Sequence, residues 1–287
     1  MPLSLVNSGI YNNLTYKYVG TIEASVNAKG DSLQVSLSQS FQRFKMSLLL
    51  LFLMIVPSVL CSDYRWSSCD NPSTYAEGSK YSTNLNQVLN DLSFNAPKSL
   101  GFNTSFRGTY PNEVYGLLQC MGYISPAKCS DCSRQAINSS QEYCPNNMGV
   151  RVWMEQCFLH YDNNSFISTL DATPIVLSSY DNVTGNIENF KATTSSLLSF
   201  LSDTACTSAN KLFAVGSATY STSNQVYGLV QCWRDLSIND CKSCLDEATQ
   251  ALEEYYTQQG AQVLSGSCTV RYEVYPFFEA LPQGMAD

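Results

Sequence analysis

Residues 120–132 read CMGYISPAKCSDC and place three cysteines in the spacing C-x8-C-x2-C. The same spacing returns 112 positions later in residues 232–244, CWRDLSINDCKSC, and nearly identical segments lead into the two copies, VYGLLQC from Val114 and VYGLVQC from Val226. A period of this length indicates a duplicated domain rather than a solenoid unit, because about 110 residues can bury a core of their own. The chain is therefore predicted to be a tandem repeat of two modules.

Length, charge and cysteine content limit the classes of protein to consider. A chain of 287 residues that is 44% hydrophobic suggests about two domains, in agreement with the repeat. Only 14% of the residues are charged and the net charge is −8, which leaves no basic stripe to displace phosphate counterions. Nucleic acid is therefore not an expected partner. Twelve cysteines are typical of an exported protein that forms disulfides.

A targeting segment lies well inside the chain. The first 40 residues are rich in Ser and Asn without sustained periodicity, so residues 1–45 are expected to be disordered or a gene-model extension, with Met46 as the initiator. The basic segment FQRFKM then precedes the apolar run SLLLLFLMIVPSVL and a small-residue cleavage site at Cys61, which predicts a signal peptide over residues 46–61. A signal-anchor helix is disfavoured because the run is shorter than the ~20 residues that span a bilayer. The mature chain is expected to be secreted, with no membrane segment.

Each module shows the same order of predicted elements. The segments that begin at Val114 and Val226 are predicted strands, and Ser125 and Ser237 are predicted N-caps of helices that carry C-x2-C in their first turns. A β-branched and aromatic segment closes each module and is predicted to be one long strand. The predicted fold class is α+β, with two helices on an antiparallel sheet in each of two tandem modules. The first helix of each module has an apolar stripe, formed by Leu85, Val88, Leu89 and Leu92 or by Phe190, Leu197, Leu198 and Leu201.

The cysteines could serve three kinds of chemistry. C-x2-C is half of a zinc ribbon, but the two copies lie in separate modules and His160 is the only histidine, so neither a metal nor another cofactor is expected. A thioredoxin-like redox pair would also suit the start of a helix, but the surrounding pattern lacks a βαβ unit. Structural disulfides are the favoured interpretation, and each would contribute about 3 kcal/mol by constraining the unfolded chain.

The repeated cysteine core, the VYGL-x-QC lead-in and the closing SGSCTVRYEVYPFF resemble the plant cysteine-rich repeat secretory proteins, whose modules are similar to the antifungal seed protein ginkbilobin. Double modules of this kind also form the ectodomains of cysteine-rich receptor-like kinases and of plasmodesmata-located proteins. The resemblance implies a disulfide-stapled sheet of about five strands with two helices per module. We place the first module at 62–165, a linker at 166–178, the second module at 179–279 and a tail at 280–287.

The second module departs from the cysteine pattern of the family. The position of Cys144 falls at Tyr255 or Tyr256 and that of Cys69 falls near Tyr180, so both halves of one bridge are missing together. Cys206 is left unpaired, as a buried free thiol or as an intermolecular link. The pairs that the resemblance implies are Cys69–Cys144, Cys120–Cys129, Cys132–Cys157, Cys232–Cys241 and Cys244–Cys268.

The resemblance also implies a ligand site. Some ginkbilobin-like proteins bind mannose through an Asn after the first cysteine, an Arg on the last strand and an acidic residue past the last cysteine. In the first module these positions hold Asp70, Arg151 and Asp162, so only the Arg is retained, and an Asp accepts hydrogen bonds from a sugar but cannot donate one. The alternative for Arg151 is a surface ion pair with Asp162 or Glu155. The corresponding positions of the second module are Asp181, Gln262 and Glu273.

An enzymatic role is not expected. The sequence has no Ser/His/Asp set and no glycine-rich phosphate loop, and the adjacent acids Glu253 and Glu254 would point in different directions on a helix. The aromatic residues Trp153 and Trp233 are expected either to stack on sugars or, more simply, to be buried in the sheets or between the modules. Candidate sites of N-glycosylation are Asn103, Asn138, Asn163 and Asn182.

These observations together predict a secreted, non-enzymatic binding protein of the apoplast that acts in stress or antifungal defence, with mannose-type carbohydrate recognition as its candidate activity. The alternative is a structural, adhesion or protein-interaction role, such as that of a plasmodesmata-located ectodomain without its membrane helix, which would act at the plasma membrane of plasmodesmata. The expected partner is a cell-wall glycan or an extracellular protein, and a second copy of the chain is a further candidate. No nucleic acid, membrane, cofactor or metal is expected.

Overall fold

A computed structural model of the chain describes residues 13–18, 22–29, 32–37, 64–207 and 212–279. They fall into two compact units, Met1–Cys61 and Ser62–Asp287. The predicted signal peptide at 46–61 lies outside the described residues. The strands of the first unit are β1 (Asn13–Tyr18), β2 (Ile22–Lys29) and β3 (Ser32–Leu37).

These three strands form an antiparallel sheet of order β1-β2-β3, in a segment for which the sequence analysis expects no regular structure. The segment SLQVSL of β3 alternates polar and apolar residues with the period of two that is characteristic of a strand. The average composition of the first 40 residues does not reflect this alternation.

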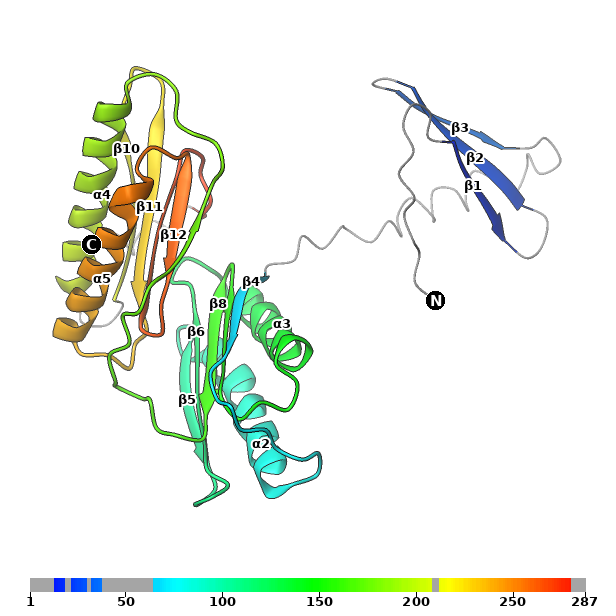
Figure 1. Cartoon of the computed structure of the whole chain (residues 1–287), viewed down its shortest axis with the longest axis vertical. Coiled ribbons are helices and arrows are strands. Elements are labelled where there is room, and N and C mark those ends of the chain that lie inside the picture. The colour runs from blue at the N-terminus through cyan, green and yellow to red at the C-terminus, as the bar shows by residue number, and fades with distance from the viewer. Residues whose placement is uncertain (1–12, 19–21, 30–31, 38–63, 208–211, 280–287) are drawn as a thin grey trace. The chain divides into compact units, whose positions relative to one another are not determined.

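The second unit contains both predicted modules, and the first of them is built on a five-stranded antiparallel sheet of order β4-β7-β8-β6-β5. The helices α2 (Lys80–Asn95) and α3 (Pro126–Tyr143) cover one face of this sheet, with the short 3-10 helix η2 (Ala96–Lys98) after α2 (Figure 1). The strands are β4 (Tyr64–Cys69), β5 (Phe102–Arg107), β6 (Val114–Cys120), β7 (Val150–Met154) and β8 (Cys157–Asp162).

The second module repeats this plan with a sheet of order β10-β11-β13-β12-β9. Its helices are α4 (Ile187–Thr207) and α5 (Ile238–Leu252), and η3 (Glu253–Tyr255) follows α5 (Figure 1). The α+β class with two helices on an antiparallel sheet in each module is therefore confirmed. The strands are β9 (Ile175–Ser178), β10 (Phe213–Thr219), β11 (Gln225–Cys232), β12 (Gly260–Leu264) and β13 (Cys268–Glu273).

The helices begin where the capping residues predict. The side chain of Ser125 accepts a hydrogen bond from the Lys128 N–H at 3.3 Å, and that of Ser237 accepts one from the Asp240 N–H at 3.1 Å. Each bond satisfies a backbone donor that a helix start leaves without a partner. The apolar stripes predicted on α2 and α4 are buried against their sheets.

The predictions for the closing strand of each module and for the linker are wrong. The closing segment of each module is a hairpin and not one long strand, because a turn at Glu155 separates β7 from β8 and a turn at Gly266 separates β12 from β13. The linker is also shorter than the predicted 166–178. Its last four residues form β9, which pairs with β12 and belongs to the second sheet.

Five disulfides tie the helices to the sheets, and they are the five pairs that the family resemblance implies. Cys120–Cys129 closes the corner between β6 and α3, and Cys232–Cys241 closes the equivalent corner between β11 and α5. Among the described residues, Cys206 is the one free cysteine, and its side chain is half-buried.

A third apolar cluster, which we call the intermodule cluster, joins the two modules. The rings of Phe158 and Trp233 stack at a centroid distance of 4.5 Å and an interplanar angle of 7°. The Gln231 side-chain amide adds two hydrogen bonds, accepting from the Gly122 N–H at 2.9 Å and donating to the Cys120 carbonyl at 3.0 Å. The cluster consists of Leu117, Met121, Trp153, Phe158, Trp233 and Leu264.

Candidate functional site

Arg151 lies on β7 and points away from the helices. Its neighbours Val150 and Val152 are fully buried in the core between the sheet and the helices, and side chains alternate between the two faces of a strand. The adjacent strand β4 pairs Ser68 with Arg151, and beyond its end the Asp70 N–H donates to the Gly149 carbonyl at 2.8 Å. The strand register therefore places the side chain of Asp70 beside that of Arg151.

The Arg151 guanidinium binds two carboxylates. Its Nε and Nη2 donate to the two oxygens of Asp70 at 2.5 and 2.9 Å, and its Nη1 donates to Asp171 Oδ2 at 2.6 Å. Burial disfavours the charged guanidinium, but the bonds and charges of Asp70 and Asp171 outweigh that effect and raise the pKa of Arg151. The ion pair predicted with Asp162 or Glu155 is thus made with Asp70 and with a residue of the linker instead.

Asp162 lies next to this pair and has different partners. It accepts hydrogen bonds from the backbone N–H of Asn164 at 2.7 Å and from its side-chain amide at 3.1 Å. Burial, together with the nearby charge of Asp70, raises the pKa of Asp162. Gly149 permits the close approach, since a Cβ at this position would collide with Asp162 Oδ2. We call Asp70, Arg151, Asp162 and Asp171 the Arg151 cluster.

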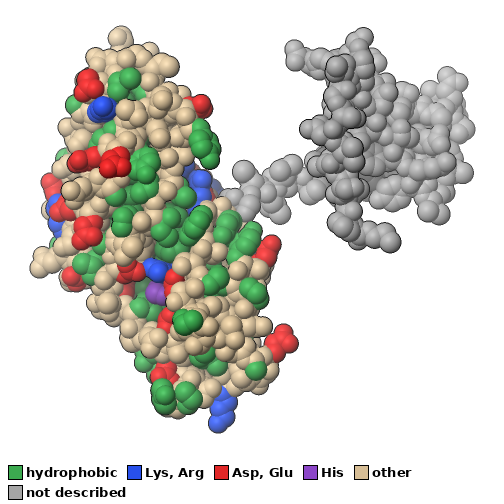
Figure 2. Space-filling view, in the orientation of Figure 1, with side chains coloured by type: hydrophobic (Ala, Val, Ile, Leu, Met, Phe, Trp, Pro, Cys, Tyr) green, Lys and Arg blue, Asp and Glu red, His purple; other side chains and the backbone are tan. Residues whose placement is uncertain are grey.

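Amide side chains extend the cluster at the same end of the sheet. The Asn71 side chain donates to Asn163 Oδ1 at 2.7 Å, and the Asn164 side chain donates to the same oxygen at 3.0 Å. The imidazole of His160 stacks on Phe166 at 3.5 Å, and burial together with the positive charge of Arg151 lowers the pKa of His160. Figure 2 shows the histidine at the surface with basic and acidic side chains beside it, so solvent reaches this region.

Trp66 is an exposed aromatic residue on β4, where it pairs with Trp153 while Ser68 pairs with Arg151. It precedes Ser68 by two positions on β4 and so shares its face, and the Ser68 hydroxyl donates to Asp70. The side chain of Trp66 is 44% exposed. The indoles that the sequence analysis considered for sugar stacking, Trp153 and Trp233, are buried in the intermodule cluster. The sequence indicates Trp66 only through its position two residues before Ser68 in the short strand YRWSSC, where alternate residues share one face.

The second module places different residues at the equivalent positions. Ser178 pairs with Ala261 as Cys69 pairs with Val150, and the Ser179 N–H donates to the Gly260 carbonyl at 2.8 Å. The counterparts of Cys69 and Asp70 are therefore Ser178 and Ser179, and the predicted Tyr180 and Asp181 are wrong by two positions. Without a cysteine in β9, the sequence offered no anchor for the alignment.

The other two equivalents in the second module do not form a comparable cluster. Gln262 is buried, and its amide donates to Thr269 Oγ1 at 3.2 Å. Glu273 instead accepts a hydrogen bond at 2.9 Å from the Nε of Arg271, a residue in β13 at the position that His160 occupies in β8. The expected positions therefore converge on a charged site in the first module alone.

Arg271 forms a structural ion network between the modules. Its Nη1 donates to Glu155 Oε1 of the first module at 2.6 Å, and its guanidinium lies 4.1 Å from the centre of the Phe277 ring. Glu155 also accepts a hydrogen bond from Arg65 Nε at 2.5 Å. Burial disfavours the ionised form of Glu155, but the charges of Arg271 and Arg65 outweigh that effect and lower its pKa. With 6% of its side chain exposed, Arg271 is a packing element and not a ligand site.

The candidate glycosylation sites differ in their exposure to solvent. Of the sequons, Asn138 and Asn182 are exposed and Asn103 and Asn163 are half-buried. Within the part of the chain that the structure describes, no three His, Cys, Asp or Glu side chains are grouped to hold a metal ion. None of the helices described there has the length and apolar character needed to cross a bilayer.

Comparison with known proteins gives consistent matches over both modules. The family model described as salt stress response/antifungal matches residues 68–164 and 178–275. An antimicrobial ginkbilobin-2-like protein of Castanea crenata is 36% identical over 233 residues, which are 80% of this chain and 95% of that protein. The cysteine-rich repeat secretory protein 38 of Arabidopsis thaliana is 37% identical over 211 residues, which are 72% of this chain and 82% of that protein.

Some longer proteins match this chain over only part of their own length. The cysteine-rich receptor-like protein kinase 6 of Arabidopsis thaliana is 35% identical over 216 residues, but these are only 32% of the kinase and 73% of this chain. Among solved structures, the tandem DUF26 ectodomain of the Arabidopsis thaliana cysteine-rich receptor-like protein PDLP5 has a TM-score of 0.64 at 26% identity. The match covers 74% of this chain and 99% of that ectodomain.

Proposed function

Because the chain belongs to the salt stress response/antifungal family, with two cysteine-rich DUF26 modules in tandem, we propose that it is an extracellular, non-enzymatic recognition protein that binds a mannose-type carbohydrate at the Arg151 cluster. Support for the extracellular location comes from relatives whose names describe secretory proteins and receptor ectodomains. Support for a defence role comes from the Castanea crenata relative, which is named antimicrobial.

The observation that carries the proposal is the convergence of Asp70 and Asp171 on Arg151. The exposed Trp66 shares a face of β4 with Ser68, the strand partner of Arg151. Carboxylates and guanidinium groups bind neighbouring hydroxyls of a sugar ring through paired hydrogen bonds. An exposed indole offers an apolar face on which the C–H face of a sugar can pack. The half-buried side chains of the cluster are already positioned by the strand register, which lowers the entropy cost of binding.

The three ion-paired residues are not equally available to a ligand. Asp70 holds the guanidinium with two hydrogen bonds and is 16% exposed, whereas Asp171 makes one ion pair and is 41% exposed. A sugar hydroxyl would therefore displace Asp171 and leave the Asp70 pair intact. Asp70 would accept hydrogen bonds from hydroxyl donors, and the Arg151 N–H groups would donate to hydroxyl oxygens.

The test is a glycan array, followed by calorimetric titration with a mannose oligosaccharide. Trp66→Ala and Arg151→Ala are each expected to weaken binding by tenfold or more, since each loss is worth about 1.4 kcal/mol or more. Arg134→Ala is the matched control, because Arg134 is an exposed arginine of the first module that pairs with Asp131 away from the cluster. Absence of glycan binding by the unmodified protein, or equal binding by the Arg134 and Arg151 variants, would overturn the proposal.

A protein-binding role is the second candidate, and one observation favours it. A groove between α4 and the edge strand β10 is lined by Leu197, Leu201 and Val215, with Phe200 66% exposed at its side. Exposed apolar side chains beside an open sheet edge are typical of protein interaction sites. A pull-down from cell-wall extract would distinguish the two roles, because Phe200→Ser would abolish capture of a protein partner without changing glycan binding.

A further inference from the structure

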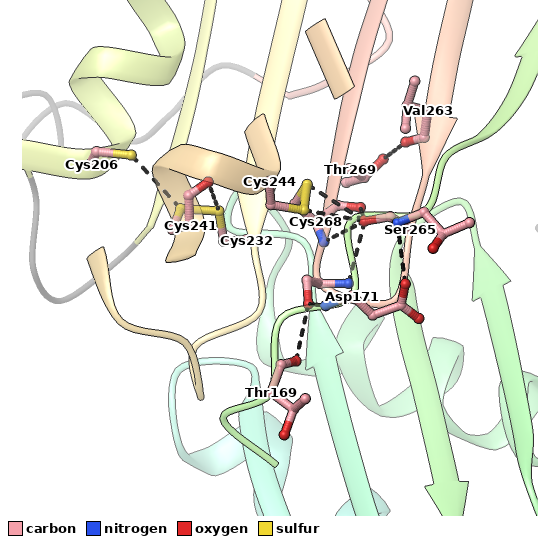
Figure 3. Close-up of a disulfide and its surroundings, with 12 residues drawn as sticks. Thr169, Asp171, Cys206, Cys232, Cys241, Cys244, Val263, Ser265, Cys268 and Thr269 are labelled. Atoms are coloured by element: carbon pink, nitrogen blue, oxygen red, sulfur yellow. Dashed lines mark hydrogen bonds between the residues drawn. A yellow bond between two sulfur atoms is a disulfide. The ribbon is translucent and has the colours of Figure 1, made fainter. Parts of the chain in front are cut away.

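Three sulfur atoms lie together where α4 packs against the start of α5. Cys206, the residue before the last of α4, has its Sγ 3.9 Å from the Sγ of Cys241 (Figure 3). Cys241 lies in the first turn of α5 and is bonded to Cys232 at the end of β11. Cys232 and Cys241 are fully buried, whereas Cys206 is half-buried. The free thiol is thus the solvent-facing member of the group.

We propose that these three cysteines form a thiol–disulfide exchange site in which Cys206 displaces Cys232 from Cys241. The Cys206 thiolate attacks the Cys241 Sγ, the Cys206–Cys241 bond forms and the Cys232–Cys241 bond breaks. The electron pair leaves on Cys232, which takes up the proton that Cys206 released. The numbers of disulfides and thiols do not change, so the step needs no external oxidant or reductant.

The geometry selects both the attacked sulfur and the leaving group. Cys206 Sγ contacts the Cys241 Sγ, so attack there expels Cys232. Closing 3.9 Å to a bond length of about 2.0 Å requires a shift of about 2 Å, which is within the range of a rotamer change in a half-buried side chain. The Cys232 Sγ lies 3.5 Å from the Cys241 carbonyl oxygen, which would accept a hydrogen bond from the Cys232 S–H group after the exchange.

The exchange would change which elements are held together. The bridge between β11 and α5 would become a bridge between α4 and α5, two helices that pack on the same sheet face. The end of β11 would then be held by strand pairing with β13 and by its neighbouring strand β10. Cys206 thus makes two covalent arrangements of the second module available.

The first module serves as an internal control, because its described residues include no free cysteine. Leu92 of α2 and Leu201 of α4 both lie against the glycine of the central VYGL segment in their own module. Five positions after these leucines stand Pro97 and Cys206. The Cys120–Cys129 bridge of the first module therefore has a proline where the second module has a thiol.

The charges around Cys206 control how fast the exchange runs. Burial raises the pKa of the Cys206 thiol, and the carboxylates of Asp246 on α5 and Asp203 on α4 act in the same direction. Lys242 on α5 opposes them and forms ion pairs with both carboxylates. Thiolate is therefore scarce at neutral pH, and the exchange rate is expected to rise about tenfold per pH unit until the thiol is ionised.

The first experiment uses the unmodified full chain. It is incubated at a series of pH values and quenched with acid. It is then unfolded in guanidinium chloride below neutral pH in the presence of N-ethylmaleimide, so that buried thiols also react, and mapped by mass spectrometry without reduction. The expected result is label at Cys206 before incubation and an increasing share at Cys232 afterwards, appearing about tenfold faster per pH unit. Label confined to Cys206 at every pH, or new label at Cys241 in place of Cys232, would overturn the proposal.

The second experiment removes the leaving group. When Cys232→Ser is refolded with oxidised glutathione, which accepts the two electrons, Cys206 and Cys241 are expected to form a disulfide with each other, so neither is labelled. In the matched control Cys120→Ser, treated in the same way, the partner Cys129 is expected to stay a labelled thiol, because the described part of the first module holds no free cysteine. Label on both Cys206 and Cys241 in folded Cys232→Ser would refute the proposed pairing, and the experiment on the unmodified chain decides the question if that variant does not fold.

Discussion

The two tryptophans of the intermodule cluster are almost equally buried but differ in one hydrogen bond. Trp153 is 2% exposed and Trp233 is 1% exposed. The Trp153 Nε1–H donates to the Ser265 carbonyl of the other module at 3.1 Å. The Trp233 Nε1–H has no acceptor among the described residues, and its ring is held by stacking on Phe158. Replacing each indole by phenylalanine therefore has different consequences for two side chains with the same burial.

Both substitutions lose a similar amount of apolar contact. Their costs in unfolding free energy therefore differ mainly through the hydrogen bond of the indole N–H. Trp153→Phe also leaves the Ser265 carbonyl without its partner, which costs about 1–3 kcal/mol. Trp233→Phe removes a buried N–H that has no partner, which offsets part of its lost packing. We expect Trp153→Phe to be the more destabilising substitution by about 2 kcal/mol. Trp233→Ala, which empties the site, is expected to cost about 3–5 kcal/mol.

Urea unfolding followed by far-ultraviolet circular dichroism measures these differences as shifts in the unfolding midpoint at constant slope. Trp233→Ala is the reference variant. It is expected to lower the unfolding midpoint more than Trp233→Phe does, because alanine loses all the ring contacts. Equal midpoints for the two phenylalanine variants, or a lower midpoint for Trp233→Phe, would refute the assignment of the polar terms.

Two further predictions concern the first module. Replacing Cys69 and Cys144 by serine opens a loop with a sequence separation of 75 and is expected to cost about 4.5 kcal/mol, against about 2.6 kcal/mol for Cys120 and Cys129 with a separation of 9. Thermal unfolding of the two double variants measures the order, and a larger loss from the shorter loop would contradict the chain-entropy argument. Asp162 has a pKa raised by burial, so its ionised form destabilises the folded state at neutral pH. Asp162→Asn is therefore expected to stabilise the protein above that pKa, with the gain disappearing as the pH falls and Asp162 is protonated, whereas a gain that persists in acid would contradict this explanation.

Much of the fold could be predicted because the repeat presents each element twice. Two copies of a helix stripe, a capping serine and a cysteine spacing reduce the number of architectures that fit both. The hairpins were missed because Glu155 and Gly266 interrupt segments that otherwise have strong strand propensity. Single turns of this kind are decided by pairing between neighbouring strands and not by local composition.

The candidate site was predicted less completely, for reasons that lie in tertiary structure. Arg151 and Asp70 could be paired through their positions relative to the cysteines, but Asp171 belongs to the linker, outside the repeat. Arg271 and Glu155 come from different modules, so no comparison of the two copies indicates their contact. The proximity of Cys206 to Cys241 depends on how α4 packs against α5, which the spacing of the cysteines does not encode.

The edge strand β9 links the site in the first module to the stability of the second. It carries no disulfide, whereas its counterpart β4 ends in Cys69, which is bonded to Cys144. The chain enters β9 from Asp171, which Arg151 holds. If the proposed ligand takes Arg151 from Asp171, it releases this attachment, and occupancy of the site and local opening of β9 would be thermodynamically coupled. Bound sugar would speed amide hydrogen exchange in β9, and a substitution that loosens β9 would in turn tighten sugar binding.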